Sequence, residues 1–131
     1  MRIAAEAVAF AALLAAAPSH AETATERGEA QLTRMLGDRT AGEQVECFHW
    51  TNATKPVVID RVALVYDTGP VLYVARPANA ELLDPRDTIR VDRQSSSRLC
   101  ARDRFYVVTR EGGLITGKAE IAGFVPYARP R

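Results

Sequence analysis

Few residue types in this 131-residue chain could assemble a catalytic centre, and their spacing argues against the familiar ones. The chain has two His, and only His49 lies beyond residue 21, so a Ser-His-acid hydrolase would have to use it. The hydroxyl candidates Ser95, Ser96 and Ser97 form one polar run without the Gly-x-Ser-x-Gly pattern of a nucleophile elbow. The sequence therefore predicts no nucleophilic catalytic site.

The sequence supports a metal or cofactor site no better than it supports a nucleophilic catalytic site. A structural zinc site needs four Cys or His ligands, and the chain beyond residue 21 offers only Cys47, His49 and Cys100. No acidic calcium loop is present, and no glycine-rich loop joins a strand to a helix. Asp84 and Asp87 could pair in space as a glycosidase requires, but a charge-balanced turn is the simpler interpretation. We expect neither a metal nor a cofactor.

The basic residues are unevenly distributed along the chain. Residues 86–110 contain seven Arg and three Asp, whereas residues 22–60 contain four basic and seven acidic side chains. Five of these arginines could line an anion site, with Tyr73 or Tyr106 stacking nearby: Arg90, Arg93, Arg98, Arg102 and Arg104. The candidate residues for binding an anion or a partner are Tyr73, Arg76, Arg93, Arg98 and Arg102. The alternative is a solvated strand face on which Asp92 and Asp103 pair with the arginines.

The two cysteines, Cys47 and Cys100, favour a structural disulfide. They lie 53 residues apart, which is far from the close Cys-x-x-Cys spacing of a redox pair. In an exported chain of this length the compartment is oxidising and a small core benefits from a covalent tie. Closing a loop of this length should stabilise the fold by about 4 kcal/mol.

The N-terminus has the three-part pattern of a secretory signal. Met1 and Arg2 precede an apolar stretch over residues 7–17, and Pro18-Ser-His-Ala21 forms a small-x-small exit. An 11-residue apolar run is too short to cross a bilayer, which takes about 20 residues. We expect cleavage after Ala21, with residues 22–131 forming one domain and no membrane span. The abundance of Arg and Ala fits a bacterium with a GC-rich genome, and thus a periplasmic or secreted protein.

The elements predicted for residues 22–131 are mostly strands. Thr23-Ala-Thr-Glu26 has capping-box spacing and Gly37 could end the helix, which would have one short apolar face. Short β-rich runs follow at residues 45–50, 57–59, 62–66, 71–75, 88–91, 104–109 and 118–121. Turn residues predict hairpins at 67–70 and around 111–113. The fold class predicted is mainly β (α+β), a small antiparallel barrel or sandwich of about six or seven strands with a short N-terminal helix.

Four fragments together resemble a family of small exported proteins of Sphingomonas-like and related proteobacteria. They are Leu36-Gly-Asp-Arg-Thr-Ala-Gly42, Val65-Tyr66 with Leu72-Tyr-Val-Ala-Arg-Pro77, Leu99-Cys-Ala-Arg-Asp103 and Gly123-Phe-Val-Pro-Tyr127. The chain departs from the family at Ala75, where members usually have Asn, and in the run that follows the first cysteine. The resemblance implies a periplasmic protein with two matching cysteines, and it implies no particular activity.

The leading hypothesis is a non-enzymatic periplasmic module that binds an envelope protein or an anionic envelope polymer. In one version, residues 93–98 form a loop that plugs the active site of another enzyme. A net charge of +1 gives no indication of a nucleic-acid partner. The alternatives are a small hydrolase that uses Asp84, Asp87, Asp103 and Arg102, and a purely structural envelope protein. Two carboxylates converging in a concave pocket would favour the hydrolase.

Overall fold

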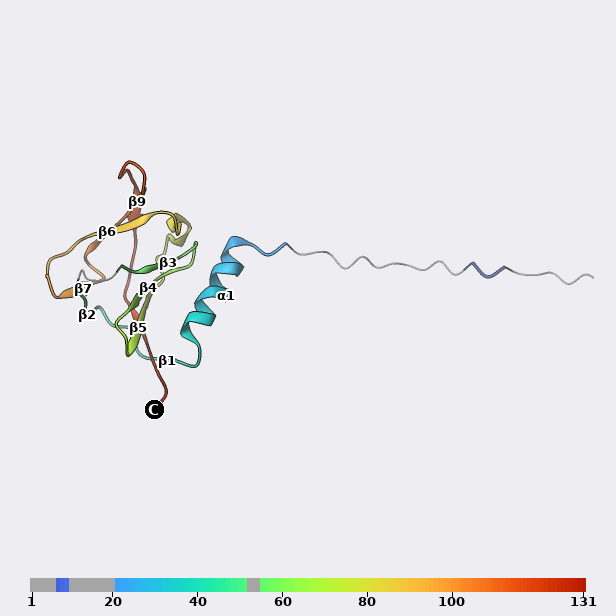
Figure 1. The fold of residues 1–131 in the computed structure, drawn as a ribbon, viewed down its shortest axis with the longest axis horizontal. Helices are drawn as coiled ribbons and strands as arrows, with labels where there is room; N and C mark the ends of the chain where they lie inside the picture. The colour runs from blue at the N-terminus through green and yellow to red at the C-terminus, as the bar shows by residue number, and fades with distance from the viewer. Residues whose placement is uncertain (1–6, 10–20, 52–54) are drawn as a thin grey trace, which may run out of the picture.

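The computed structural model describes residues 7–9, 21–51 and 55–131 and confirms a mainly β fold (Figure 1). These residues contain one α-helix, one short 3-10 helix and ten strands in three antiparallel sheets, packed like a sandwich without a closed barrel. The expected signal segment lies almost entirely outside the described residues. In the described part of the chain, no helix combines the length and the apolar composition needed to cross a membrane.

Helix α1 spans Ala24–Leu36, and the 3-10 helix η1 spans Ala80–Leu82. The strands are β1 Thr40–Ala41, β2 Cys47–His49, β3 Val57–Ile59, β4 Ala63–Asp67, β5 Val71–Ala75, β6 Thr88–Asp92, β7 Arg98–Cys100, β8 Arg104–Val108, β9 Ile115–Ala119 and β10 Val125–Ala128. The largest sheet has the order β1-β10-β5-β4-β3, and the others are β6-β8-β9 and β2-β7. Both predicted hairpins are confirmed, with glycines at positive φ in each turn.

Ten strands form where six or seven were expected, because the sequence pattern does not indicate β1, β7 or β10. β1 has only two residues, and the three residues of β7 begin with Arg98 directly after the polar run 95–97, so neither segment reads as a β-rich run. A proline such as Pro126 cannot donate a backbone hydrogen bond and therefore argues against a strand at β10. The Pro126 carbonyl oxygen accepts a hydrogen bond from Gly42 N at 2.7 Å, so the carbonyl points toward β1. The nitrogen of a strand residue points to the same side as its carbonyl, so Pro126 removes no hydrogen bond to β5. β9 begins three residues earlier than predicted and ends where Glu120 N bonds the Asn79 side chain.

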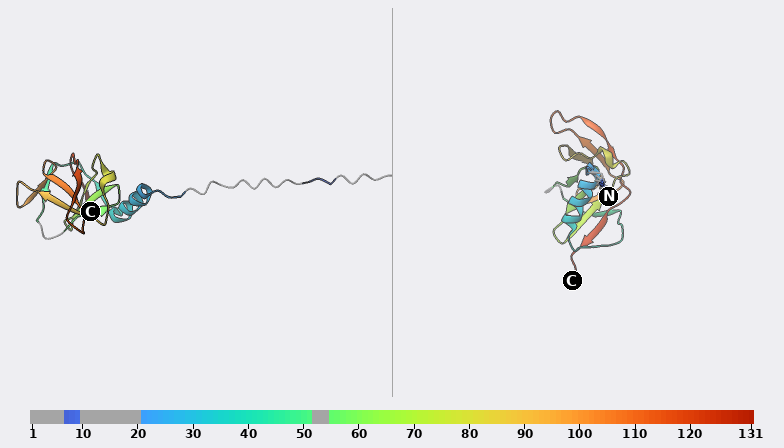
Figure 2. Two further views of the ribbon diagram at one scale, coloured as in Figure 1. Left: turned by 90° about the horizontal axis from the view of Figure 1, so that it is seen from above. Right: turned by 90° about the vertical axis from the view of Figure 1, so that its right-hand side faces the viewer.

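Helix α1 begins and ends where the sequence predicts. Thr23 Oγ1 accepts a hydrogen bond from Glu26 N at 3.1 Å, and Gly37 terminates the helix at φ 58°. Leu32 is fully buried, and Met35 and Leu36 pack beside it against the large sheet. Figure 2 shows the helix lying along one side of the β-rich body.

Strand β4 is buried on both faces, which makes the large sheet the middle layer. Its residues alternate between an apolar cluster under α1, which contains Ala63 and Val65, and a second cluster that contains Leu64 and Tyr66. In the antiparallel register Tyr66 is opposite Tyr73 and Leu64 is opposite Ala75, so these side chains share one face of the sheet. The alternation of residues 62–66 predicts Val62 on the same face as Tyr66, but Val62 packs under the helix, because the chain turns at Arg61, φ 57°, just before the strand.

The predicted disulfide is present and joins β2 to β7. Cys47 and Cys100 are directly opposite each other in the antiparallel register, with their Cα atoms 4.1 Å apart. The next residue, Phe48, is buried among four aromatic rings, those of Trp50, Tyr66, Tyr73 and Phe124. The disulfide therefore holds the two-stranded sheet at the position where it inserts an aromatic side chain into the second cluster.

Replacement of Gly28 by Ala should destabilise the protein, although Ala is the better helix former. A Cβ at position 28 would lie 2.6 Å from both Asp60 O and Val62 Cγ2, and the first of these is backbone. Overpacking of this kind costs about 1–3 kcal/mol, against a gain in helix propensity of about 1 kcal/mol. We expect a net loss of up to about 2 kcal/mol in urea unfolding followed by circular dichroism. Thr25→Ala, on the exposed side of α1, is the control and should change little.

Loss of the disulfide should remove about 4 kcal/mol of stability, the amount expected for a 53-residue separation. The measurement is urea unfolding of the wild type and of the Cys47→Ser, Cys100→Ser double variant. Adding a reductant should shift the wild-type midpoint to that of the double variant and leave the double variant unchanged. Equal midpoints for oxidised wild type and double variant would show that the bridge contributes nothing.

Candidate functional site

The structure does not bring the five predicted binding residues into one site. Arg76 forms a two-point ion pair with Glu29 of helix α1, at 2.7 and 3.1 Å between nitrogen and oxygen. Tyr73 stacks parallel to Phe48 with ring centroids 4.1 Å apart, so one face of its ring is covered. Arg76 therefore fastens the helix to the end of β5, and Tyr73 belongs largely to the core.

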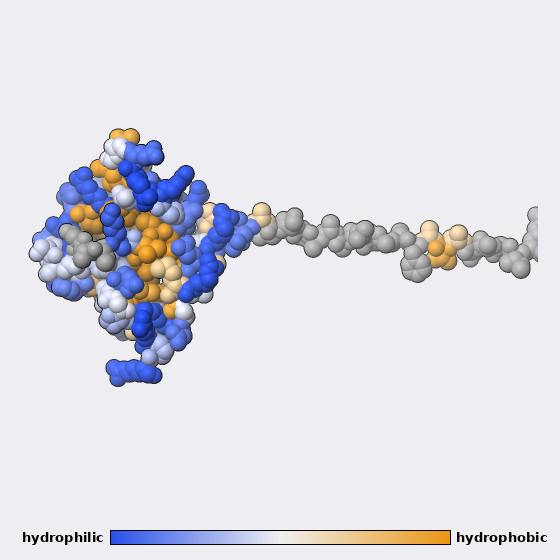
Figure 3. Space-filling model, in the orientation of Figure 1, coloured by the Kyte–Doolittle hydropathy of each residue, from blue (hydrophilic) through white to orange (hydrophobic). Residues whose placement is uncertain are grey.

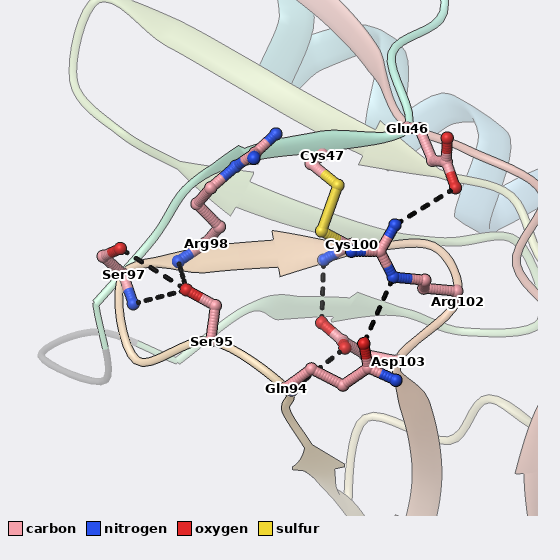
Figure 4. The surroundings of a disulfide bond; sticks show 9 residues. All are labelled: Glu46, Cys47, Gln94, Ser95, Ser97, Arg98, Cys100, Arg102 and Asp103. Carbon is pink, nitrogen blue, oxygen red and sulfur yellow. Dashed lines mark hydrogen bonds and ion pairs between the residues drawn. A yellow bond between two sulfur atoms is a disulfide. The ribbon is translucent and has the colours of Figure 1, made fainter.

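Arg98 and Arg102 flank the disulfide (Figure 4). Arg102 Nε donates to Gln94 Oε1 at 3.3 Å, and its Nη1 lies 3.8 Å from a Glu46 carboxylate oxygen. Arg98 is exposed and lies opposite His49 in the β2–β7 pair. These two arginines are thus on the surface beside the bridge, and the Glu46 carboxylate partly neutralises the positive charge of Arg102.

The carboxylates proposed for a hydrolase are also dispersed. Asp103 is buried and accepts hydrogen bonds from Cys100 N at 2.8 Å and Gln94 N at 3.3 Å, which closes the turn after β7. Asp84 receives two guanidinium bonds from Arg86, which lower its pKa to about 2. Asp87 precedes β6 and Asp103 precedes β8, so these two lie at opposite ends of the antiparallel β6–β8 pair. In the described part of the chain, no group of three or more potential ligands could hold a metal ion.

A pocket that the sequence did not indicate lies beside the second apolar cluster. Its volume is about 120 Å³, and residues from β4, β6, β7 and the segments that follow β2 and β6 line it. They are Trp50, Lys55, Pro56, Tyr66, Ile89, Val91, Arg93 and Leu99, and we call this the Tyr66 pocket. Its lining combines apolar and polar surface, and the polar side chains end in a phenol, a guanidinium and an ammonium. All three can donate hydrogen bonds.

Tyr66 supplies the most unusual group in this pocket. The residue is 1% exposed, and its hydroxyl has no hydrogen-bond partner among the described residues. The Trp50 ring packs edge-on against it with centroids 5.0 Å apart. Burial raises the pKa of the phenol, and the positive charge of Arg93 partly opposes this. The hydroxyl is therefore a neutral donor without an acceptor in the described part of the chain, and such buried groups are rare and costly.

Arg93 is the one predicted binding residue that belongs to the Tyr66 pocket. Its guanidinium donates to the carbonyl oxygen of Trp50, which joins the segment after β6 to the segment after β2. Arg90 and Arg104 instead point away from the core, each beside Asp92. No pattern in the sequence could have grouped Trp50, Tyr66 and Arg93, because they come from three separate segments that meet only in the folded protein.

The ion pair between Glu29 and Arg76 should contribute a small, pH-dependent stability. Arg76 lowers the pKa of Glu29, so the contribution is fully present above the unfolded-state pKa and is lost as the pH falls through the lower folded-state value. Both side chains are about half exposed, which limits the pair to about 0.2–1 kcal/mol. Arg76→Gln should be less stable than wild type by this amount at pH 7 in urea unfolding. The difference should shrink toward zero as the pH is lowered, and a difference that grows would contradict the assignment.

The chain was compared with protein-family models, with curated proteins and with solved structures, and none of them matches it. Within the described residues, the lining of the Tyr66 pocket combines apolar side chains, a tyrosine whose buried hydroxyl has no partner, and two cationic side chains.

Proposed function

We propose that this chain is a non-enzymatic binding module that holds a small anionic group, carried on an apolar body, in the Tyr66 pocket. The observation that carries the proposal concerns Tyr66, which lines the pocket and has a buried hydroxyl without an acceptor among the described residues. A ligand oxygen at this position would satisfy the hydroxyl and relieve the cost of its burial.

The chemistry of the lining indicates a carboxylate or a similar oxyanion. An ionised carboxylate only accepts hydrogen bonds, and the Tyr66 hydroxyl, the Arg93 guanidinium and the Lys55 ammonium are donors. Ile89, Val91 and the Trp50 ring form the apolar wall for the rest of the ligand. A volume of about 120 Å³ limits the enclosed part to a small group.

Binding is proposed to occur in the periplasm or outside the cell. The disulfide supports this location, because such bonds form and persist in oxidising compartments. The signal-like N-terminus and the resemblance to small exported proteobacterial proteins support it as well. The enclosed group would then belong to an envelope protein or to an anionic envelope polymer.

Hydrolysis has weaker support than binding. A general acid needs a pKa near the working pH, and the two guanidinium bonds from Arg86 hold Asp84 far below it. Asp103 is occupied by two backbone N–H groups. The Tyr66 pocket itself has no carboxylate in its lining. These observations favour a binding role for the pocket.

Benzoate is a suitable probe, because it joins a carboxylate to a small apolar ring. Trp50 is the only Trp in the chain and lines the pocket, so its fluorescence reports occupancy directly. We expect a saturable change in Trp50 emission on titration with benzoate, and a much weaker effect with benzyl alcohol, which lacks the charge. Equal affinity for the two compounds would contradict the proposal.

Tyr66→Phe tests the hydrogen bond itself. A bond from a neutral donor to a charged acceptor contributes about 1.5 kcal/mol or more, so the variant should bind benzoate about tenfold more weakly. Its stability should not fall, because the substitution removes a buried hydroxyl that has no partner among the described residues. Tyr106→Phe, on the outer side of β8, is the matched control and should bind as the wild type does. Unchanged binding by Tyr66→Phe would overturn the assignment.

A further inference from the structure

Two open sheet edges lie on either side of a groove that leads to the Tyr66 pocket. Among the described residues, β3 is the last strand of the large sheet and pairs only with β4, and β6 is the last strand of its sheet and pairs only with β8. Figure 1 shows β3 and β6 on the same side of the molecule, and Figure 3 shows apolar side chains gathered on this face around β3. Open edges of this kind are templates for pairing with another chain.

The groove has a volume of about 520 Å³, which lies within the range of ligand-binding clefts. Lys55, Pro56 and Val58 line one side, and Thr88, Ile89 and Arg90 line the other. The lining of the Tyr66 pocket shares three of these residues, Lys55, Pro56 and Ile89, so the two spaces adjoin.

The backbone edge of β6 faces the groove. Side chains of a strand alternate between its two faces, so three consecutive residues can border one space only along the strand edge. Thr88, Ile89 and Arg90 are consecutive and all line the groove. Within the part of the chain that the structure describes, the backbone hydrogen bonds of β6 go to β8 alone. The outer backbone groups of this strand are thus available to a partner.

The charges along the groove select the partner. Lys55, Arg90 and Arg110 line it together with one carboxylate, that of Asp87. The adjoining pocket adds Arg93. An acidic segment would complement this surface, and complementary charge favours both encounter and specificity.

We propose that the occupant is the extended, acidic C-terminal segment of a partner protein, which adds as a strand to the edge of β6. Its last residue places an apolar side chain and the terminal carboxylate in the Tyr66 pocket. This inference rests on the proposed function and names its ligand. Strand addition supplies affinity through main-chain hydrogen bonds, and the pocket supplies specificity for the chain end.

The probe is a hexapeptide of alternating Glu and Val, acetylated at its N-terminus and ending in Val with a free carboxylate. We expect it to bind at least tenfold more tightly than benzoate, measured by Trp50 fluorescence and by calorimetry. Amidation of the C-terminus should weaken binding about tenfold or more. N-methylation of alternate amides should weaken binding strongly for one set of amides and little for the other, because only one set faces β6.

Substitution of Arg90 tests the groove without changing the pocket. Arg90→Glu should weaken binding of the peptide about tenfold and leave binding of benzoate unchanged. Arg104→Glu is the matched control, because Arg104 is an exposed neighbour that does not line the groove, and it should change neither. Bound peptide should also slow hydrogen exchange of the β6 amides that point away from β8.

The outcomes separate this inference from the proposed function. If benzoate binds but the hexapeptide binds no more tightly, or if both N-methylated sets behave alike, the peptide inference is overturned and the pocket assignment stands. If neither benzoate nor the hexapeptide changes Trp50 emission, both are overturned. If the amidated peptide binds as well as the free acid, the placement of the C-terminus in the pocket is wrong.

Discussion

The burial of strand β4 on both of its faces is the constraint on which the rest of the structure depends. One face needs helix α1 as a cover, and this requires Gly28 where the helix approaches the Asp60 carbonyl and Val62. The other face carries Leu64 and Tyr66 and needs the smaller sheets to cover it. A sheet with two covered faces removes more apolar surface from water than a single layer does, which is how one small domain obtains an adequate core.

The disulfide and the aromatic cluster work together to close the second face. β2 and β7 form a sheet of only two strands, which would be marginal by itself. The Cys47–Cys100 bond joins them covalently, and Phe48 anchors them among the rings of the core. The same arrangement brings Trp50 against Tyr66, so the tie that stabilises the fold also forms one wall of the pocket.

The arginines illustrate how a charge pattern divides into different roles in a folded protein. Arg76 holds the helix, Arg86 closes a turn around Asp84, and Arg102 lies between Gln94 and Glu46. Only Arg93 reaches the pocket, and Arg90 borders the groove beside it. Arg110 also lines the groove, so the binding surface proposed for this chain uses three of the seven arginines in residues 86–110, in combination with apolar side chains and a buried phenol.

Structural features that depend on residues close together in the chain can be predicted from the sequence. The sequence could predict helix α1 with its Thr23 and Gly37 caps, both hairpins, and the alternation through β4 and β5, because each depends on residues close together in the chain. It could also predict the disulfide, because the chain has only two cysteines to pair. Strand β10 could not be predicted, because Pro126 is tolerated only where β1 has already ended. Nor could the pocket, since Trp50, Tyr66 and Arg93 are distant along the chain and are brought together only by the packing of three sheets. Sequence patterns report which side chains prefer to be buried, and tertiary packing decides which of them meet and whether a buried hydroxyl finds a partner.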